Sequence, residues 1–108
     1  MCIDSSHLYD DGLLFFQLNG NAVMRLSRTA AMSVCRLATD RSFHVLRVEG
    51  GIWHSPGFEA RVDSIWDSKY GNLNNDIIMT NNESAVEFIK NESFDINSFI
   101  ITVSGVVL

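Results

Sequence analysis

The side chains best suited to covalent chemistry are one cysteine thiol and three imidazoles. Cys35 is the thiol inside the part of the chain expected to form a core, and a Cys/His pair can supply a nucleophile and its base. The histidines are His7, His44 and His54. However, Cys35 stands beside Ala31 and Val34 in an apolar stripe, whereas a reactive thiol needs exposure and groups that stabilise its thiolate. We therefore interpret Cys35 as a core residue and expect no catalytic residues.

The spacing of the remaining candidates does not indicate a metal or phosphate site. Neither Cys2 nor Cys35 has a second cysteine or histidine at the distances found in zinc sites. Gly50-Gly51 lacks the lysine and the following helix of a phosphate-binding loop, so we predict a tight turn in which glycine adopts a positive φ. Glu59 and Asp63 show no fixed pair geometry for acid/base work. We expect neither a metal nor a cofactor.

The elements that position these side chains follow from capping and periodicity. Ser27 can cap a helix, and apolar residues at helical spacing after it predict a helix over 28–39. Residues 43–49 and 98–103 are rich in strand formers, so we predict a strand over each of these ranges. Residues 58–66 alternate between mostly apolar and polar side chains, which predicts a third strand.

The stretch between the second and third strands is predicted as a long loop followed by a helix. Residues 67–82 are polar and rich in Gly and Asn, so we expect a loop there, with 77–79 as a possible short strand inside it. Asn81 or Asn82 then caps a second helix. Its inward stripe consists of Ala85, Val86, Phe88 and Ile89.

The order helix, strand, strand, helix, strand predicts a small single-domain α+β fold, with a mostly antiparallel sheet and two helices packed on one face. A chain of 108 residues is too short for two cores. We assign residues 24–108 to the domain and residues 1–23 to an N-terminal extension. Within that extension the apolar run 13–16 is either an edge strand or part of a loose leader.

Charge is unevenly distributed along the chain. Residues 24–48 hold five arginines against one aspartate, whereas nine acids and three bases follow from Glu49 onward, within a total of −5. This balance argues against a nucleic-acid binder with many phosphate contacts. The asymmetry is typical either of a face that steers toward a basic partner or of an ordinary solvated surface. Because no apolar stretch is long enough to span a membrane and no signal peptide is recognisable, we expect a cytoplasmic protein.

Several aromatic side chains are candidate partner contacts. Trp66 is in phase with Phe58 and Val62 on the expected strand, which favours the core over a partner surface. Trp53 stands in an expected bend, so its side chain can be interpreted either as a partner contact or as a core residue. His54 beside it is a candidate contact because exposed loop residues carry function. We expect His44 to be a surface or packing histidine.

Several separated pieces of the chain occur in an order that is typical of one family. The most specific is Gly50-Gly51, Trp53 and Pro56-Gly57-Phe58. The others are Met24-Arg25-Leu26-Ser27, Ala30-Ala31, Val34-Cys35, Asp63-Ser64, Trp66, Asn81-Asn82, Ala85, Glu87, Ile89-Lys90 and the closing run 99–102. In these residues the chain resembles the immunity proteins of tRNA-cleaving colicins of the E-five type. Residues 1–23 have no counterpart in the resemblance, and residues 59–70 align only with small gaps.

The resemblance implies a stoichiometric inhibitor, and not an enzyme. Such a protein binds the ribonuclease domain of its colicin or bacteriocin and fills the cleft where the tRNA anticodon would lie. A cleft that binds RNA is basic and offers stacking surfaces, so acids and flat side chains suit its inhibitor. We expect the toxin contacts to be Glu49, Trp53, His54, Glu59, Asp63, Trp66 and Asp67. The expected partner is a basic protein, with no direct nucleic acid and no membrane; the alternative is an orphan acidic module of the same fold with another basic partner.

Overall fold

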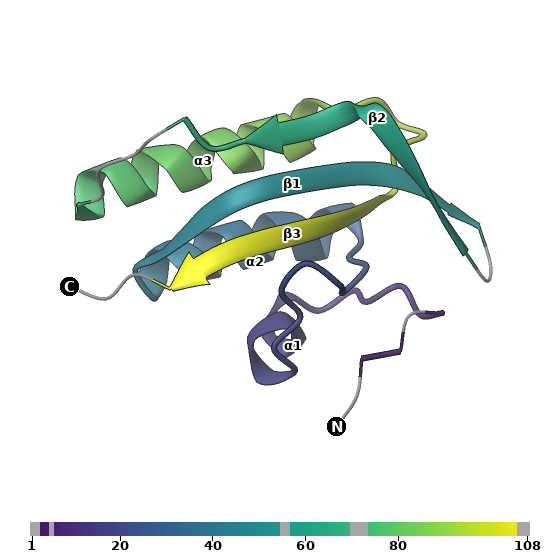
Figure 1. The fold of residues 1–108 in the computed structure, drawn as a ribbon, viewed down its shortest axis with the longest axis horizontal. Helices are drawn as coiled ribbons and strands as arrows, with labels where there is room; N and C mark the ends of the chain where they lie inside the picture. The colour runs from purple at the N-terminus through teal and green to yellow at the C-terminus, as the bar shows by residue number, and fades with distance from the viewer. Residues whose placement is uncertain (1–2, 5, 55–56, 70–73, 106–108) are drawn as a thin grey trace.

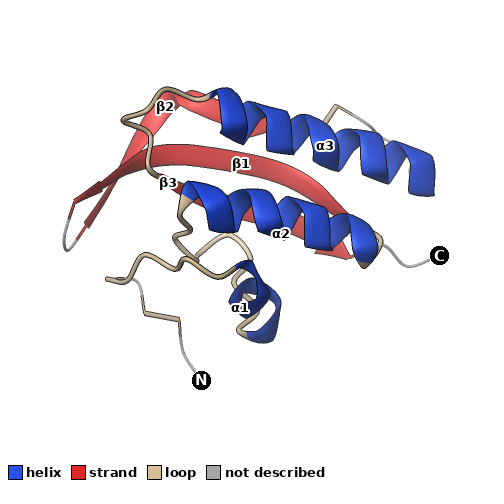
Figure 2. Ribbon diagram, turned by 180° about the vertical axis from the view of Figure 1, so that it is seen from behind, coloured by secondary structure: helices blue, strands red, loops and turns tan. Residues whose placement is uncertain are grey.

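The fold is an antiparallel sheet with two helices on one face. The structure is a computed structural model that describes residues 3–4, 6–54, 57–69 and 74–105, without the side chains of 54 and 57–63. Its elements in chain order are α1 (Gly12–Gln17), α2 (Arg28–Asp40), β1 (Phe43–His54), β2 (Gly57–Asp67), α3 (Asn75–Asn91) and β3 (Ser98–Gly105). The strand order is β2-β1-β3, and α2 and α3 lie side by side behind the sheet (Figure 1, Figure 2). The expected α+β fold is confirmed.

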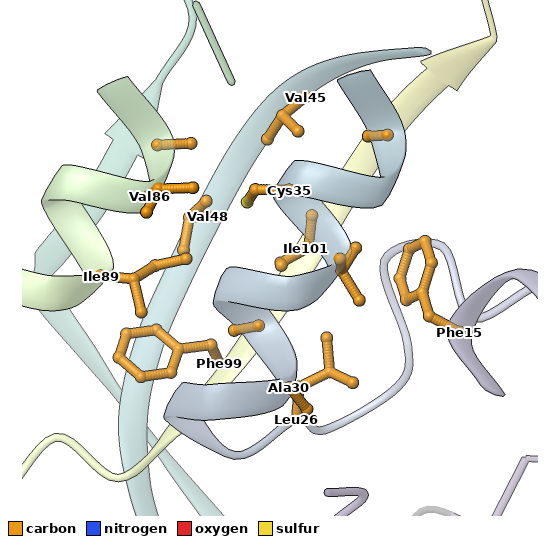
Figure 3. Close-up of a cluster of buried hydrophobic side chains, with 14 of the residues drawn as sticks. Phe15, Leu26, Ala30, Cys35, Val45, Val48, Val86, Ile89, Phe99 and Ile101 are labelled. Carbon is orange, nitrogen blue, oxygen red and sulfur yellow. The ribbon is translucent and has the colours of Figure 1, made fainter. Parts of the chain in front are cut away.

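The core lies between the sheet and the helices α2 and α3. Ser27 Oγ accepts a hydrogen bond from the backbone N–H of Ala30 at 3.2 Å, so the predicted cap and helix are confirmed. The buried face of α2 is made of small residues, which let the helix lie close to the sheet. Side chains from both helices, β1 and β3 interdigitate there (Figure 3). They include Val34, Cys35, Val45, Val48, Val86, Ile89, Phe99 and Ile101.

The predicted loop over 67–82 is wrong in its second half, because α3 already begins at Asn75. Asn74 Oδ1 accepts a hydrogen bond from the backbone N–H of Ile77 at 2.9 Å, so the cap lies upstream of the predicted one. Residues 77–79 are therefore helical rather than a strand, and Asn81 and Asn82 lie inside the helix. Asparagine favours caps over helix interiors, but buried hydrogen bonds to β1 outweigh that preference here.

The two buried asparagines complete the edge of β1 beyond the end of β2. Asn82 Oδ1 accepts from the Val45 N–H at 3.0 Å, and Asn82 Nδ2 donates to the Phe43 carbonyl at 2.9 Å. Asn81 Nδ2 donates to the Val45 carbonyl at 2.9 Å. Both asparagines are at most 1% exposed. Because a buried backbone group without a partner is costly, these side chains substitute for a neighbouring strand.

The tight turn predicted at Gly50-Gly51 is also wrong, since β1 runs through both glycines to His54. No glycine in the described ranges has a positive φ, and the strand register shifts between Glu49 and Gly51. The reason for glycine here is space. A Cβ on Gly50 would lie 2.8 Å from Ile96 Cγ2 and would overlap Ser64 Oγ.

Residues 13–16 form part of helix α1 rather than the expected edge strand or loose leader. The Asp11 carboxylate caps this helix by accepting from the Leu13 N–H at 3.0 Å, and Phe15 is 2% exposed in the core. The following segment covers the outer edge of β3, where Leu26 and Phe99 exchange two backbone hydrogen bonds of 2.8 Å. A six-residue helix is too short to show helical periodicity. The boundary between an extension and a domain at residue 24 stays a prediction.

His44 is a packing residue, 4% exposed, and its ring extends the asparagine cluster. Its Nε2 lies 2.7 Å from Ser68 Oγ, which donates to Asn81 Oδ1 at 2.7 Å. Burial lowers the pKa of His44 below its usual 6.5, and the Asn81 side chain offsets this only in part. The unfolded chain therefore takes up a proton at this residue at a higher pH than the folded chain does.

We predict that Asn82→Ala lowers the free energy of unfolding by about 3 kcal/mol, because it leaves two buried backbone groups of β1 without partners. Urea unfolding checks this through the midpoint at unchanged slope. Ser84→Ala, on the exposed side of the same helix, is the control and should change stability by less than about 0.5 kcal/mol. Equal midpoints for the two variants would show that the asparagine contacts do not stabilise the sheet.

We also predict that part of the acid sensitivity of the fold comes from His44. Since the unfolded chain binds the proton first, the free energy of unfolding should fall as the pH drops below about 6.5. His44→Gln should flatten this decline below about pH 6.5. Urea unfolding at a series of pH values measures both slopes. Identical profiles for the wild-type and His44→Gln chains would contradict the assignment.

Candidate functional site

All seven expected toxin contacts lie on the β1–β2 hairpin. Glu49 pairs with Ile65, and Asp67 pairs with Arg47. Trp53, His54, Glu59 and Trp66 pair with Phe58, Gly57, Ile52 and Val48, respectively. Asp63 lies in β2 between the two halves of the ladder, where the strand register shifts. Three of the seven, His54, Glu59 and Asp63, have side chains outside the described part of the chain, so only their strand positions are known.

Glu49 and Asp67 lie on the sheet face opposite the helices. Val48 is fully buried under the helices, and neighbouring residues of a strand point to opposite faces, so Arg47 and Glu49 point away from the core. Their cross-strand partners share that face. Figure 1 shows the sheet in front of both helices, with no other helix or strand of the described chain over this face. Side chains here are thus available to a partner.

A cross-strand ion pair ties Asp67 to Arg47. Arg47 Nε lies 2.6 Å from Asp67 Oδ1, and Arg47 Nη2 lies 3.1 Å from Oδ2, which is a two-point contact. The Asp67 carboxylate raises the pKa of the Arg47 guanidinium mainly through these hydrogen bonds, and Glu49 adds a smaller attraction. Both side chains are about half exposed, so solvent screens the pair. In the free protein Asp67 is therefore already paired with Arg47. Glu49 interacts with the same arginine only through the smaller attraction.

The two tryptophans have different surroundings. Trp66 is opposite Val48, shares the face of the helices and packs against the core while partly buried. This is the interpretation that the sequence pattern favoured for Trp66. Trp53 is also partly buried, but it lies near the far end of the hairpin, where its backbone N–H donates to Asn97 Oδ1 at 2.7 Å.

The loop between α3 and β3 braces the hairpin, and the sequence pattern did not indicate this role. The Asn97 N–H donates to the Gly51 carbonyl at 3.1 Å, and Ser64 Oγ donates to a Glu92 carboxylate oxygen. Arg28 holds the loop itself through hydrogen bonds to its backbone carbonyls. One signal was present: Arg28 is in the first turn of α2, where a cation opposes the helix dipole and thus needs another partner.

The cysteine that could have served as a nucleophile lies in the core. Cys35 is fully buried, and burial raises the pKa of its thiol to about 12, so the thiolate is not accessible at neutral pH. Within the described ranges, no group of three His, Cys, Asp or Glu residues could hold a metal ion. In the same ranges no helix is both long and apolar enough to cross a membrane.

Comparison with known proteins gives consistent matches. A family model described as "Colicin-E5 Imm protein" matches residues 24–104. The immunity protein CdiI of Burkholderia pseudomallei is 44% identical over 102 residues, which cover 94% of this chain and 94% of that protein. The colicin-E5 immunity protein of Escherichia coli is 34% identical over 80 residues, covering 73% of this chain and 96% of that protein.

A second protein of Escherichia coli, the colicin-E5 immunity protein in ColE9, is 32% identical over 80 residues, with the same coverage of both chains. The family model spans α2, β1, β2, α3 and all but the last residue of β3. On this evidence the chain belongs to the colicin-E5 immunity protein family.

Proposed function

We propose that this chain is a stoichiometric inhibitor that binds the ribonuclease domain of a tRNA-cleaving toxin and blocks its active-site cleft. The observation that carries the proposal is the placement of the expected contacts on one hairpin, in a chain whose relatives are named immunity proteins. A two-stranded ribbon that projects from a packed sheet is a shape that can enter a cleft. In this account the hairpin takes the position of the anticodon.

The chemistry of the hairpin suits such a mimic. Carboxylates can replace phosphates against the basic groups of the cleft, and flat aromatic rings can replace bases on its stacking surfaces. Glu49 and Asp67 supply acids on the open face, and Trp53 supplies an aromatic ring toward the hairpin end. We keep His54, Glu59 and Asp63 as proposed contacts on their strand positions alone. Trp66 contributes to binding indirectly, because its packing against the core holds β2 in place.

The excess of acids from Glu49 onward also serves association. Opposite charges on two proteins raise the encounter rate, which suits an inhibitor that must reach the nuclease before tRNA does. The alternative is a module of the same fold that has lost its toxin and binds another basic protein. The two differ in whether tRNA cleavage is blocked.

The experiment is a titration of the purified chain into a tRNA-cleavage assay driven by an anticodon-cutting colicin nuclease domain. We predict that cleavage ends at a ratio of one inhibitor to one nuclease, and that calorimetry on the same pair gives the same ratio. Persistent cleavage at excess chain, together with no heat of binding, would favour the alternative partner.

We further predict that Glu49→Lys weakens toxin binding by about 10-fold or more and makes the affinity less sensitive to salt, because it removes a carboxylate from the contact face. Glu87→Lys changes the net charge equally on the exposed side of α3 and is the matched control. Calorimetry at two salt concentrations measures both variants, and unfolding curves verify that they fold. Equal losses in the two variants would mean that overall charge matters and the position of Glu49 does not.

A further inference from the structure

Phe94 is the most exposed large hydrophobic side chain in the described part of the protein. Its relative exposure is 99%, whereas the other exposed large hydrophobic residues there range from 37% to 52%. It lies in the loop between α3 and β3, between Ser93 and Asp95. A phenylalanine ring fully in water gives the isolated fold little burial energy, so the whole ring is available to a partner.

The loop that carries Phe94 is held rigidly on both sides of the ring. Arg28 Nη1 donates to the carbonyls of Ile89 and Glu92 at 2.7 and 2.9 Å. Arg28 Nη2 donates to those of Ser93 and Ile96 at 2.8 and 2.6 Å. The Ile96 N–H closes the turn on the Ser93 carbonyl at 3.0 Å. Because the backbone is already ordered, a partner that binds the ring loses little conformational entropy in this loop.

A groove lies beside the exposed ring and leads toward the hairpin. Its volume is about 610 Å³, and its lining combines the apolar Phe94, Ile52 and Ile96 with the polar or charged Arg28, Asp95 and Asn97. Asn97 also binds the backbone of Trp53, so the groove joins the loop to the proposed toxin-binding hairpin. An aromatic ring at the edge of an apolar groove with a polar rim is typical of an interface hot spot.

We propose that Phe94 is an apolar anchor that inserts into a pocket of the ribonuclease toxin, alongside the contacts of the hairpin. This inference rests on the proposed function and adds a second contact region that the sequence pattern did not indicate. The charge of the loop favours this occupant over a second copy of the chain. Glu92 and Asp95 stand on either side of Phe94 in the sequence, and the guanidinium of Arg28 is already bound to backbone carbonyls. Two copies would therefore bring acids together, whereas a nuclease surface built for RNA is basic.

The test is calorimetry of the full chain with a catalytically inactive, anticodon-cutting nuclease domain. Phe94→Ala should weaken binding about 30-fold or more, as expected for an aromatic hot spot, with stability unchanged. Val23→Ala, at another exposed apolar residue, is the matched control and should bind like the wild-type chain. Equal affinity of the Phe94→Ala and wild-type chains overturns this inference alone. No binding by the wild-type chain overturns the proposed function and this inference together.

Sedimentation of the free chain tests the other occupant. A wild-type dimer that Phe94→Ala converts to a monomer would show that the ring binds a second copy, and would overturn the proposal.

Discussion

The hydrogen bonding of β1 along both edges is the constraint on which the rest of the structure depends. β3 satisfies one edge, while β2 and the adjoining Ser68 satisfy the other as far as the Leu46 carbonyl, and the buried Asn81 and Asn82 of α3 bind the backbone beyond it. This arrangement fixes α3 against the sheet, and α3 in turn ends at the carbonyls that Arg28 binds. The hairpin and the loop that braces it are therefore positioned by one continuous set of contacts.

That set of contacts leaves one face of the sheet open, and the open face is a place where polar function can be added at little cost to the fold. Charges there are partly matched within the chain, because Arg47 holds Asp67 across the strands. A partner that binds this face must either break the Arg47–Asp67 ion pair or accommodate it in the interface. This requirement favours specificity over affinity. In the complex that we propose, the long-range field of the acidic half would govern the rate of encounter, and shape and apolar contacts would govern the lifetime of the complex.

Much of this fold was predictable from local patterns, and the rest depended on distant contacts. Ser27 and the apolar stripe after it specify α2, and alternation or β-branched content specifies the strands. The predicted cap at Asn81 or Asn82 was wrong because the helical state of these residues depends on hydrogen bonds to β1, far away in the sequence. The predicted turn at Gly50 was wrong because glycine is required there by the close approach of Ile96 and Ser64. The hairpin site could be proposed from a family resemblance and charge. The exposure of Phe94 could not, since a phenylalanine in a polar loop indicates burial as readily as binding.

The central claim is that the folded chain occupies the place of the anticodon on the nuclease. The most direct test is competition between this chain and an anticodon stem-loop RNA for a catalytically inactive nuclease domain, followed by fluorescence anisotropy of the labelled RNA. We predict that the chain displaces the RNA completely, with an apparent affinity for the chain that falls in proportion to the RNA concentration. A stable ternary complex of chain, nuclease and RNA would contradict it.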